Sequence, residues 1–254
     1  MMWELRTDLD LDAANLHLAA LQAAGLAGAA EEGGRATLYF PERVEGLPVD
    51  GAWARVEDRD WLEEWKRGLE PVTVGAVTVT PPWIPAGRDA VVIEPSYAFG
   101  TGHHETTAGC LAALQELDLA GRRVLDVGTG SGVLAIAAAR LGAGAVVGID
   151  TDPLAVEVAR AGVTANAVDL EVREGSLDVV DGAFDVVVAN LDTDTHAALA
   201  GDLVGRLAGG GTLIASGVGV ARRDEAVAAF DRAGLPVVAR TGGEWVVLIG
   251  RRPG

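Results

Sequence analysis

The stretch VLDVGTGSG, residues 124–132, places a run of small residues directly after a short apolar segment. The residues that follow are apolar and rich in Ala as far as Leu141. An apolar run, a glycine-rich break and a longer apolar segment are typical of a strand, a tight turn and a helix. The sequence therefore predicts a strand that ends at Asp126 and a helix that begins near Ser131 and runs to Leu141.

The glycines of this turn have two interpretations. Gly128, Gly130 and Gly132 allow a sharp turn and let a ligand lie against the main chain, where the first amides of the helix face it. Alternatively the reason is steric, because a tight turn between strand and helix needs glycine even without a ligand. The spacing G-x-G-x-G differs from the dinucleotide pattern G-x-G-x-x-G, which counts against a nicotinamide-dependent enzyme.

Two later apolar runs also end on polar residues. AVVGID ends at Asp150, 22 residues after Gly128, where a second strand delivers a carboxylate to a ribose diol. Asp150 is alternatively a cap for the helix predicted over 152–166. The run FDVVVAN ends at Asn190, at the edge where open α/β sheets bind ligands. Three strand ends at one crevice predict a nucleoside site.

The chain divides into two kinds of organisation. From residue 90 onward, short apolar runs alternate with Ala-rich helical segments, which predicts an α/β fold with a parallel sheet and crossover helices. Residues 1–57 contain strand-like segments around one helix, as in a small α+β, ferredoxin-like domain. Helical spacing over 58–70 predicts a linker helix. Residues 71–254 then form the larger domain, which begins with a hairpin over 72–80.

The charge of the chain limits its partners. The net charge is -17, with 37 acidic and 20 basic residues, which disfavours nucleic acid and favours a basic partner. A merely solubilising surface is the alternative explanation. Residues 1–70 hold 15 acidic and 7 basic residues, so negative charge is denser there than in the rest of the chain.

The compartment follows from cysteine content and from the N-terminal residues. Cys110 is the only cysteine, which excludes an internal disulfide and fits the reducing cytoplasm. The acidic N-terminus lacks the basic start of an export signal. Residues 13–30 contain no Asp, Glu, Lys or Arg, but their Asn, His and Gln favour an amphipathic helix over a membrane span. We therefore expect no membrane contact.

One block of sequence is more specific than the glycine turn. EPSYAFGTGHHETT (94–107) occurs together with LDVGTGSGVLAIAA (125–138), ID at 149–150 and AN at 189–190. With DWLEEWKRGLEPVTVG (60–75) included, the chain resembles the ribosomal protein L11 methyltransferases over essentially its whole length. That family belongs to the class I methyltransferases, which use S-adenosylmethionine and have a Rossmann-like, seven-stranded sheet.

The resemblance implies a substrate and a set of site residues. The substrate is ribosomal protein L11, methylated on lysine side chains and on its N-terminal amine, and we expect a monomer. The cofactor S-adenosylmethionine would contact six residues: Phe99, Thr107, Gly128, Gly130, Asp150 and Asn190. Asn190 and His104 would be catalytic, with the side-chain carbonyl of Asn190 accepting an N–H of the incoming amine. A metal is not expected, because His103, His104, His196 and Cys110 form a poor ligand set.

Several features leave the substrate open. Ser96 replaces an expected Gly, and the pair His104-Glu105 replaces His-Pro, both in the substrate-facing loop. LDTDTH follows Asn190 where enzymes acting on adenine or glutamine amides have Pro-Pro-aromatic, which counts against planar substrates. Asp192 and Asp194 either hold a cationic lysine or belong to a solvated loop. Thr106 either belongs to the site or caps its helix.

Rival functions would use the same crevice. An RNA methyltransferase is disfavoured by the acidic charge, and a small-molecule enzyme leaves the acidic N-terminal segment unexplained. Another basic protein or a small-molecule amine is the alternative substrate. A non-catalytic cofactor-binding module has no need for the block at 94–107. Residues 1–57 either dock the substrate or pack rigidly as a stabilising cap.

Overall fold

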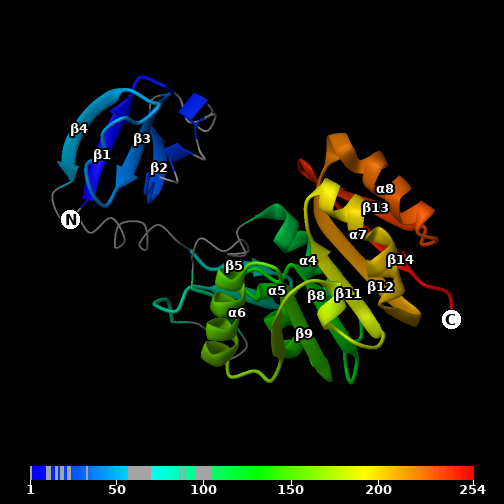
Figure 1. Ribbon diagram of the computed structural model, residues 1–254. Helices are drawn as coiled ribbons and strands as arrows, with labels where there is room; N and C mark the ends of the chain where they lie inside the picture. The colour runs from blue at the N-terminus through cyan, green and yellow to red at the C-terminus, as the bar shows by residue number, and fades with distance from the viewer. Residues whose placement is uncertain are drawn as a thin grey trace. The chain divides into compact units, whose positions relative to one another are not determined.

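A computed structural model describes residues 2–9, 13–14, 17, 20–21, 24–32, 34–56, 70–85, 87, 90–94 and 104–254. The chain forms two compact units, Met1–Leu69 and Glu70–Gly254 (Figure 1). The linker helix predicted over 58–70 lies outside the described residues, apart from Glu70. Among the described residues, no helix combines the length and apolar character needed to cross a bilayer.

The first unit is an antiparallel sheet of four strands in the order β2-β3-β1-β4. The strands are β1 (Met2–Thr7), β2 (Gly28–Glu32), β3 (Arg35–Phe40) and β4 (Gly51–Val56). This is the strand order of a ferredoxin-like domain, which confirms the predicted fold class. Residues 41–50, between β3 and β4, contain bends and no helix. Val49 from this segment joins the core that Leu5 and Phe40 form.

The helix predicted over 13–30 is too long. Residues 13–14 and 20–21 are helical, but residues 28–30 already belong to β2. Gly25 has φ +88°, and the amide of Leu26 donates to the carbonyl of Leu21 at 2.9 Å. A left-handed glycine with such a bond is a common way to end a helix.

The second unit begins with a small three-stranded sheet. β5 (Val72–Val74) and β6 (Val77–Thr80) form the predicted antiparallel hairpin. β7 (Val91–Val92) pairs with β6 in parallel. The helix α4 (Glu105–Gln115) follows. Gln115 holds this small sheet, since its Nε2 donates to the carbonyl of Val74 at 2.8 Å.

The main sheet has seven strands in the order β10-β9-β8-β11-β12-β14-β13. Their bounds are β8 Arg123–Val127, β9 Ala145–Asp150, β10 Glu171–Glu174, β11 Phe184–Asn190, β12 Leu207–Gly219, β13 Val237–Gly242 and β14 Trp245–Arg251. β14 is antiparallel to both of its neighbours, whereas β8 to β12 pair in parallel. A short turn joins β13 to β14, and such a turn permits only antiparallel pairing. The predicted seven-stranded, Rossmann-like sheet is confirmed.

Helices cover both faces of this sheet (Figure 1). Besides α4, they are α5 (Val133–Arg140), α6 (Pro153–Asn166), α7 (Thr193–Gly205) and α8 (Arg223–Arg232), with short 3-10 turns at Leu177–Val179 and Val220–Arg222. Alternate residues of β11 point to opposite faces: Val186 and Val188 belong to the core with α4 and α5, and Val187 and Ala189 to the core on the other face. Strands buried on both faces explain the continuous apolar runs in the sequence.

Helix α5 starts later than predicted. It begins at Val133 instead of near Ser131 and ends at Arg140. Gly132 precedes it as the N-cap with φ +82°, a left-handed conformation that cannot belong to the helix. The three-glycine turn therefore extends further than the apolar pattern indicates.

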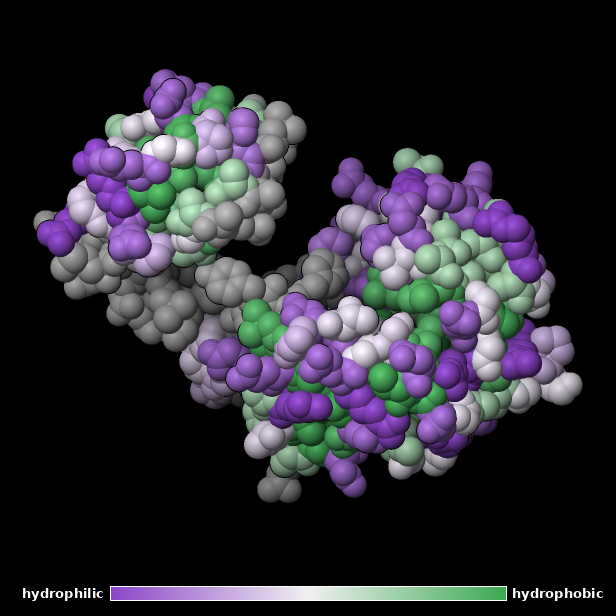
Figure 2. All heavy atoms as spheres, viewed as in Figure 1, coloured by the Kyte–Doolittle hydropathy of each residue, from purple (hydrophilic) through white to green (hydrophobic). Residues whose placement is uncertain are grey.

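The surface is mostly hydrophilic where Figure 2 shows it, with hydrophobic residues in small groups. Among the described residues, the large hydrophobic side chains that are exposed are Leu154, Val220 and Val238. Single exposed hydrophobic residues are normal in globular proteins.

Candidate functional site

The carboxyl ends of β9, β8 and β11 lie next to one another in the sheet. The glycine turn follows β8, Asp150 ends β9 and Asn190 ends β11. The chain order reverses at β8, because β9 and β10 lie on one side of it and β11 and β12 on the other. Open α/β sheets form ligand sites at such a reversal. The structure thus brings the three predicted strand ends together.

Main-chain hydrogen bonds close the glycine turn against β9. The amides of Gly128 and Thr129 each donate to the carbonyl of Ile149 at 2.9 Å. Gly128 has φ +69°, and a Cβ at this position would overlap the side chain of Leu191. Both the conformation and the close approach require glycine here. The predicted turn is confirmed, and steric crowding is one reason for glycine at this position.

The carboxylate of Asp150 braces this turn. Its Oδ2 accepts from the amide of Gly130 at 2.9 Å, and its Oδ1 accepts from the amide of Asp152 at 3.0 Å. Asp150 does not cap α6; Asp152 does, by accepting from the amide of Leu154 at 2.9 Å. Asp150 is half-buried, and each of its oxygens can accept a further hydrogen bond. It can therefore still receive the hydroxyls of a ribose.

Asn190 presents an unused acceptor. Its Nδ2 lies 3.1 Å from Oγ1 of Thr106 and 3.4 Å from Oγ1 of Thr107. Its Oδ1 is buried and has no hydrogen-bond partner among the described residues. A buried polar atom normally has a partner. An unpaired carbonyl at the edge of the sheet is therefore a candidate position for a ligand donor.

Asp126 lies beside the glycine turn and is a further candidate for the site, one that the sequence did not predict. It is buried within β8, and its Oδ2 accepts from Oγ1 of Thr129 at 2.7 Å and from the amide of Ala135 at 3.1 Å. Its Oδ1 is buried without a partner among the described residues. Burial raises the pKa of Asp126 to about 6, against the lowering effect of these hydrogen bonds. The signal in the sequence was a carboxylate inside an apolar strand, which proteins rarely bury without a purpose.

The main-chain amides of the turn and of the first turn of α5 are partly occupied. The sequence predicts that they face a ligand, but the amides of Gly130 and Ala135 already donate to Asp150 and Asp126. In this region the protein therefore offers carboxylate oxygens to a ligand as well as main-chain donors. Such a site suits a ligand with cationic groups and hydroxyls.

The start of α4 supplies the threonines that hold Asn190. Thr106 does not cap this helix; the cap is His104, whose Nδ1 accepts from the amide of Thr106 at 3.3 Å. Thr107, predicted to contact the cofactor, is fully buried, and its hydroxyl faces Asn190. Phe99, the other predicted contact before α4, lies outside the described residues.

Comparison with known proteins identifies the family. Residues 39–253 match the family model described as ribosomal protein L11 methyltransferase (PrmA). The chain is 44% identical to the ribosomal protein L11 methyltransferase of Deinococcus radiodurans, over 95% of this chain and 96% of that protein. It is 41% identical to that of Thermus thermophilus, over 97% and 98%. The chain belongs to the ribosomal protein L11 methyltransferase family.

Most of this chain has the same fold as a solved structure of the L11 methyltransferase family. A ribosomal protein L11 methylase from Lactobacillus delbrueckii subsp. bulgaricus matches with a TM-score of 0.67 and 27% identity, over 73% of this chain and all of that one. A 16S rRNA methyltransferase of Thermus thermophilus, solved with AdoMet and guanosine, matches with a TM-score of 0.59. Its identity is 20%, over 98% of this chain and 64% of that one, so it shows the fold alone.

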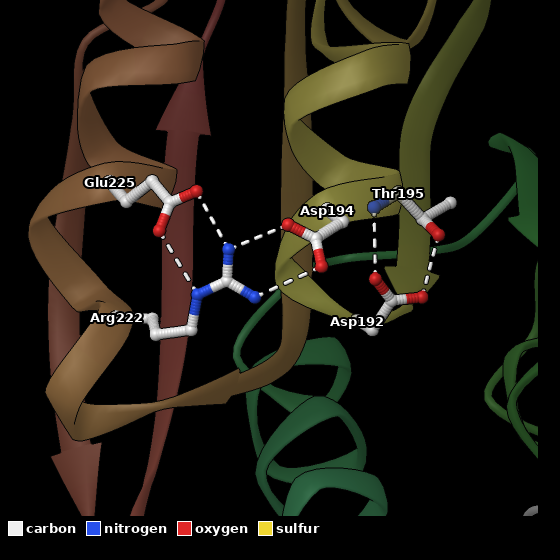
Figure 3. Close-up of polar contacts among 5 residues, drawn as sticks. All are labelled: Asp192, Asp194, Thr195, Arg222 and Glu225. Atoms are coloured by element: carbon white, nitrogen blue, oxygen red, sulfur yellow. Dashed lines mark hydrogen bonds and ion pairs between the residues drawn. The ribbon is translucent and has the colours of Figure 1, made fainter.

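In this member of the L11 methyltransferase family, the acids after Asn190 have structural partners (Figure 3). Asp192 caps α7, since its Oδ1 accepts from the amide of Thr195 at 3.0 Å and its Oδ2 from the hydroxyl of Thr195 at 2.6 Å. Asp194 accepts from both terminal nitrogens of Arg222, at 2.6 and 3.2 Å. Arg222 also binds Glu225.

These partners give both acids of the loop a role within the protein. The hydrogen bonds from Thr195 hold the pKa of Asp192 below its usual value, and Arg222 does the same for Asp194. Both carboxylates therefore stay ionised and engaged within the protein. In the structure they fix the start of α7, three residues after Asn190, and a contact with a substrate lysine stays a prediction.

Proposed function

We propose that this protein transfers methyl groups from S-adenosylmethionine to amino groups of ribosomal protein L11, on its lysine side chains and N-terminal amine. The observation that supports this most directly is the buried Oδ1 of Asn190, which has no partner among the described residues. Its amide nitrogen is already tied to α4, so the free group is an acceptor. An incoming amine supplies the matching N–H.

The residues at the sheet edge fit S-adenosylmethionine. When bound, this group supplies an electrophilic methyl whose bond to sulfur breaks as a bond to the amine nitrogen forms. Gly128 and Gly130 let the main chain approach the ligand, and Asp150 accepts from its ribose hydroxyls. Asp126 offers an unpaired buried acceptor, which suits its cationic amino group. We also propose that Thr107 and Phe99 contact the cofactor.

Methyl transfer requires that the protein bind the amine in its neutral form and orient it. An ammonium ion has no lone pair, so the nitrogen must arrive neutral, and a poorly hydrated strand end favours the neutral form. Oδ1 of Asn190 accepts one N–H and so fixes the direction of the nitrogen lone pair. Holding two reacting atoms in line supplies a large part of the rate in such transfers. The proton that leaves nitrogen passes to water.

We assign residues 1–57 to substrate docking and residues 58–70 to a linker helix. The dense negative charge of the N-terminal segment suits a basic ribosomal protein. The cofactor residues all lie in the larger unit. A separate docking unit raises the local concentration of several target amines at one active site. We further propose a cytoplasmic monomer that does not bind nucleic acid.

The test combines Asn190→Ala with purified L11. We expect this variant to bind S-adenosylmethionine in calorimetry with affinity near wild type, because other residues provide most of the contacts. Single-turnover methylation should slow by about tenfold or more, as expected when a hydrogen bond to the reacting group is lost. Methylation at the wild-type rate would remove Asn190 from the mechanism.

Choice of substrate is tested separately with wild-type protein. Labelled methyl incorporation is compared among L11, other basic ribosomal proteins and a free small amine. We expect label in L11 alone. Equal labelling of other basic proteins, or of the free amine, would replace L11 by the corresponding alternative.

A further inference from the structure

The neighbours of His104 select one tautomer of its ring. The amide of Thr106 is always a donor, and it points at Nδ1 of His104 at 3.3 Å. Nδ1 must therefore carry a lone pair, which places the ring proton on Nε2. The ring also packs edge-on against Trp245 at the start of β14, with centroids 4.9 Å apart at 66°.

The hydroxyl of Thr106 is oriented by the same nitrogen. Its Oγ1 lies 2.7 Å from Nδ1 of His104. Because Nδ1 has no proton to give, the hydroxyl must donate its single hydrogen to the ring. The oxygen of Thr106 is then left only with lone pairs toward its other neighbour.

That neighbour is the side-chain amide of Asn190. An amide can face Oγ1 of Thr106 with either its oxygen or its NH2 group, and the correct choice follows from the hydrogen-bond network. Because Oγ1 of Thr106 donates its hydrogen to His104, it can only accept from Asn190. It therefore faces the NH2 group, since the amide oxygen would be repelled. Nδ2 lies 3.1 Å from Oγ1, so Oδ1 is turned to the opposite side, where it has no partner among the described residues.

We propose that His104 is a positioning residue, which acts through Thr106 to keep the carbonyl of Asn190 turned toward the substrate. The direction of donation runs from Asn190 to Thr106 to His104. In this role His104 exchanges no proton with the substrate, which differs from the catalytic role that the family resemblance implies. The proposal rests on the proposed function, because it assumes that the carbonyl of Asn190 meets the amine.

A pair of His104 variants separates positioning from proton transfer. In His104→Asn the side-chain oxygen can replace Nδ1 as the acceptor and can also cap α4, but it cannot act as a base. His104→Ala removes the acceptor. We expect kcat for L11 methylation to fall about tenfold in His104→Ala and to stay within about threefold of wild type in His104→Asn, since one hydrogen bond sets the difference. An equally low kcat in both variants would overturn the proposal.

A second matched pair of variants tests Thr106, which lies between Asn190 and His104 in the hydrogen-bond network. Thr106→Ser keeps the hydroxyl, and Thr106→Val keeps the shape without it. We expect Thr106→Ser to keep most of the wild-type kcat, and Thr106→Val to lose it to about the same extent as His104→Ala. Full activity in Thr106→Val would show that the orientation of Asn190 does not depend on this hydroxyl.

A readout without any methylation keeps this inference distinct from the proposed function. In the full-length protein, 15N NMR of the imidazole nitrogens reports which one carries the proton. We expect a proton on Nε2 of His104 and an unprotonated Nδ1, and a shifted Asn190 side-chain NH2 signal in Thr106→Val. A proton on Nδ1 would overturn the inference. If the NMR results hold while wild type leaves L11 unmethylated, the failure belongs to the proposed substrate.

Discussion

At the scale of single residues, Asp126 makes the stability of the folded protein depend on pH. Its pKa rises from 3.8 to about 6 in the folded protein because of burial. The folded state therefore holds a proton that the unfolded chain has lost between these values. Stability contributed by this group is fully present below about pH 4 and is lost as the pH rises through 6, by about 3 kcal/mol in total.

We predict that Asp126→Asn removes this pH dependence. The neutral amide keeps an acceptor for Thr129 and Ala135, and it has no charge to bury. Urea unfolding at several pH values between 4 and 8 gives the free energy of unfolding of both proteins. The variant should gain on wild type by up to about 3 kcal/mol as the pH rises from 4 to 7. A constant difference would show that Asp126 does not titrate in this range.

Two substitutions that act in different ways test the proposed cofactor contacts. Asp150→Ala removes the carboxylate proposed to accept charge-assisted hydrogen bonds from the ligand, which are worth roughly 1.5–3 kcal/mol. Gly128→Val puts a branched side chain at φ +69° and against Leu191, so the main chain can no longer approach. We expect both to weaken binding of S-adenosylmethionine in calorimetric titration.

Matched controls come from the exposed side of α7. Asp202→Ala removes an exposed carboxylate, and Gly201→Val adds a side chain where no atom lies within 4 Å of the new Cβ. Both controls should bind S-adenosylmethionine as wild type does. Wild-type affinity in Asp150→Ala and Gly128→Val would remove these positions from the site.

Residues at strand ends could be predicted from the sequence, whereas their partners could not. Gly128, Asp150 and Asn190 each follow an apolar run, and the parallel sheet brings such ends together. The bonds from Asn190 to α4 join residues more than 80 positions apart, and no local pattern records them. His104 was missed as a helix cap because Ser, Thr, Asp and Asn are the usual residues there.

At the scale of elements, an irregularity in β12 holds the loop after Asn190. The pairing of β12 with β14 shifts between Ala215 and Val218. Within this interval Ser216 accepts from the amide of Leu191 at 3.0 Å, and its carbonyl lies 2.8 Å from Nε2 of the buried His196. Thus β12 and the first turn of α7 fix the backbone directly after Asn190.

We predict that Gly217→Ala destabilises the protein and slows methylation together. Gly217 has φ +86°, and a Cβ there would collide with the carbonyl of Leu191. The control is Gly210→Ala, at φ +75° with no atom within 4 Å of the new Cβ. The control should lose about 1–2 kcal/mol from the left-handed backbone alone. Gly217→Ala should lose more in urea unfolding and should lower kcat, which the control leaves intact.

If Gly217→Ala and Gly210→Ala lose equal stability, the close approach to Leu191 does not contribute to the free energy of unfolding. The glycines themselves could be expected at turns, but this one lies inside a long strand. Glycine is needed at position 217 because the loop at Leu191 lies against it. Sequence periodicity does not indicate such a contact between distant parts of the chain.

At the scale of the whole molecule, the two units have separate cores. Leu5, Leu38 and Phe40 belong to the first, and the clusters on both faces of the main sheet belong to the second. The composition shift and the change of pattern in the sequence indicated two domains. The proposed boundary at 57 and the linker over 58–70 remain predictions, because residues 57–69 lie outside the described residues.

Deletion of residues 1–57 tests their assignment to docking. The remaining chain keeps every predicted cofactor residue, so we expect a folded protein by circular dichroism with unchanged affinity for S-adenosylmethionine. Methylation of L11 should fall at least tenfold, because the tethering effect is lost. An unfolded remainder would support a stabilising cap, and undiminished methylation of L11 would end the docking assignment.

The reversed strand β14 has a consequence for synthesis of the protein. It lies between β12 and β13 although it follows both in the chain, so it leaves the ribosome after every other strand of the sheet. Until then β12 presents an unpaired edge and β13 has no neighbour, a condition that invites pairing with other chains. Strands β8, β9 and β11, whose ends form the candidate site, can form earlier, but the sheet that supports them closes last.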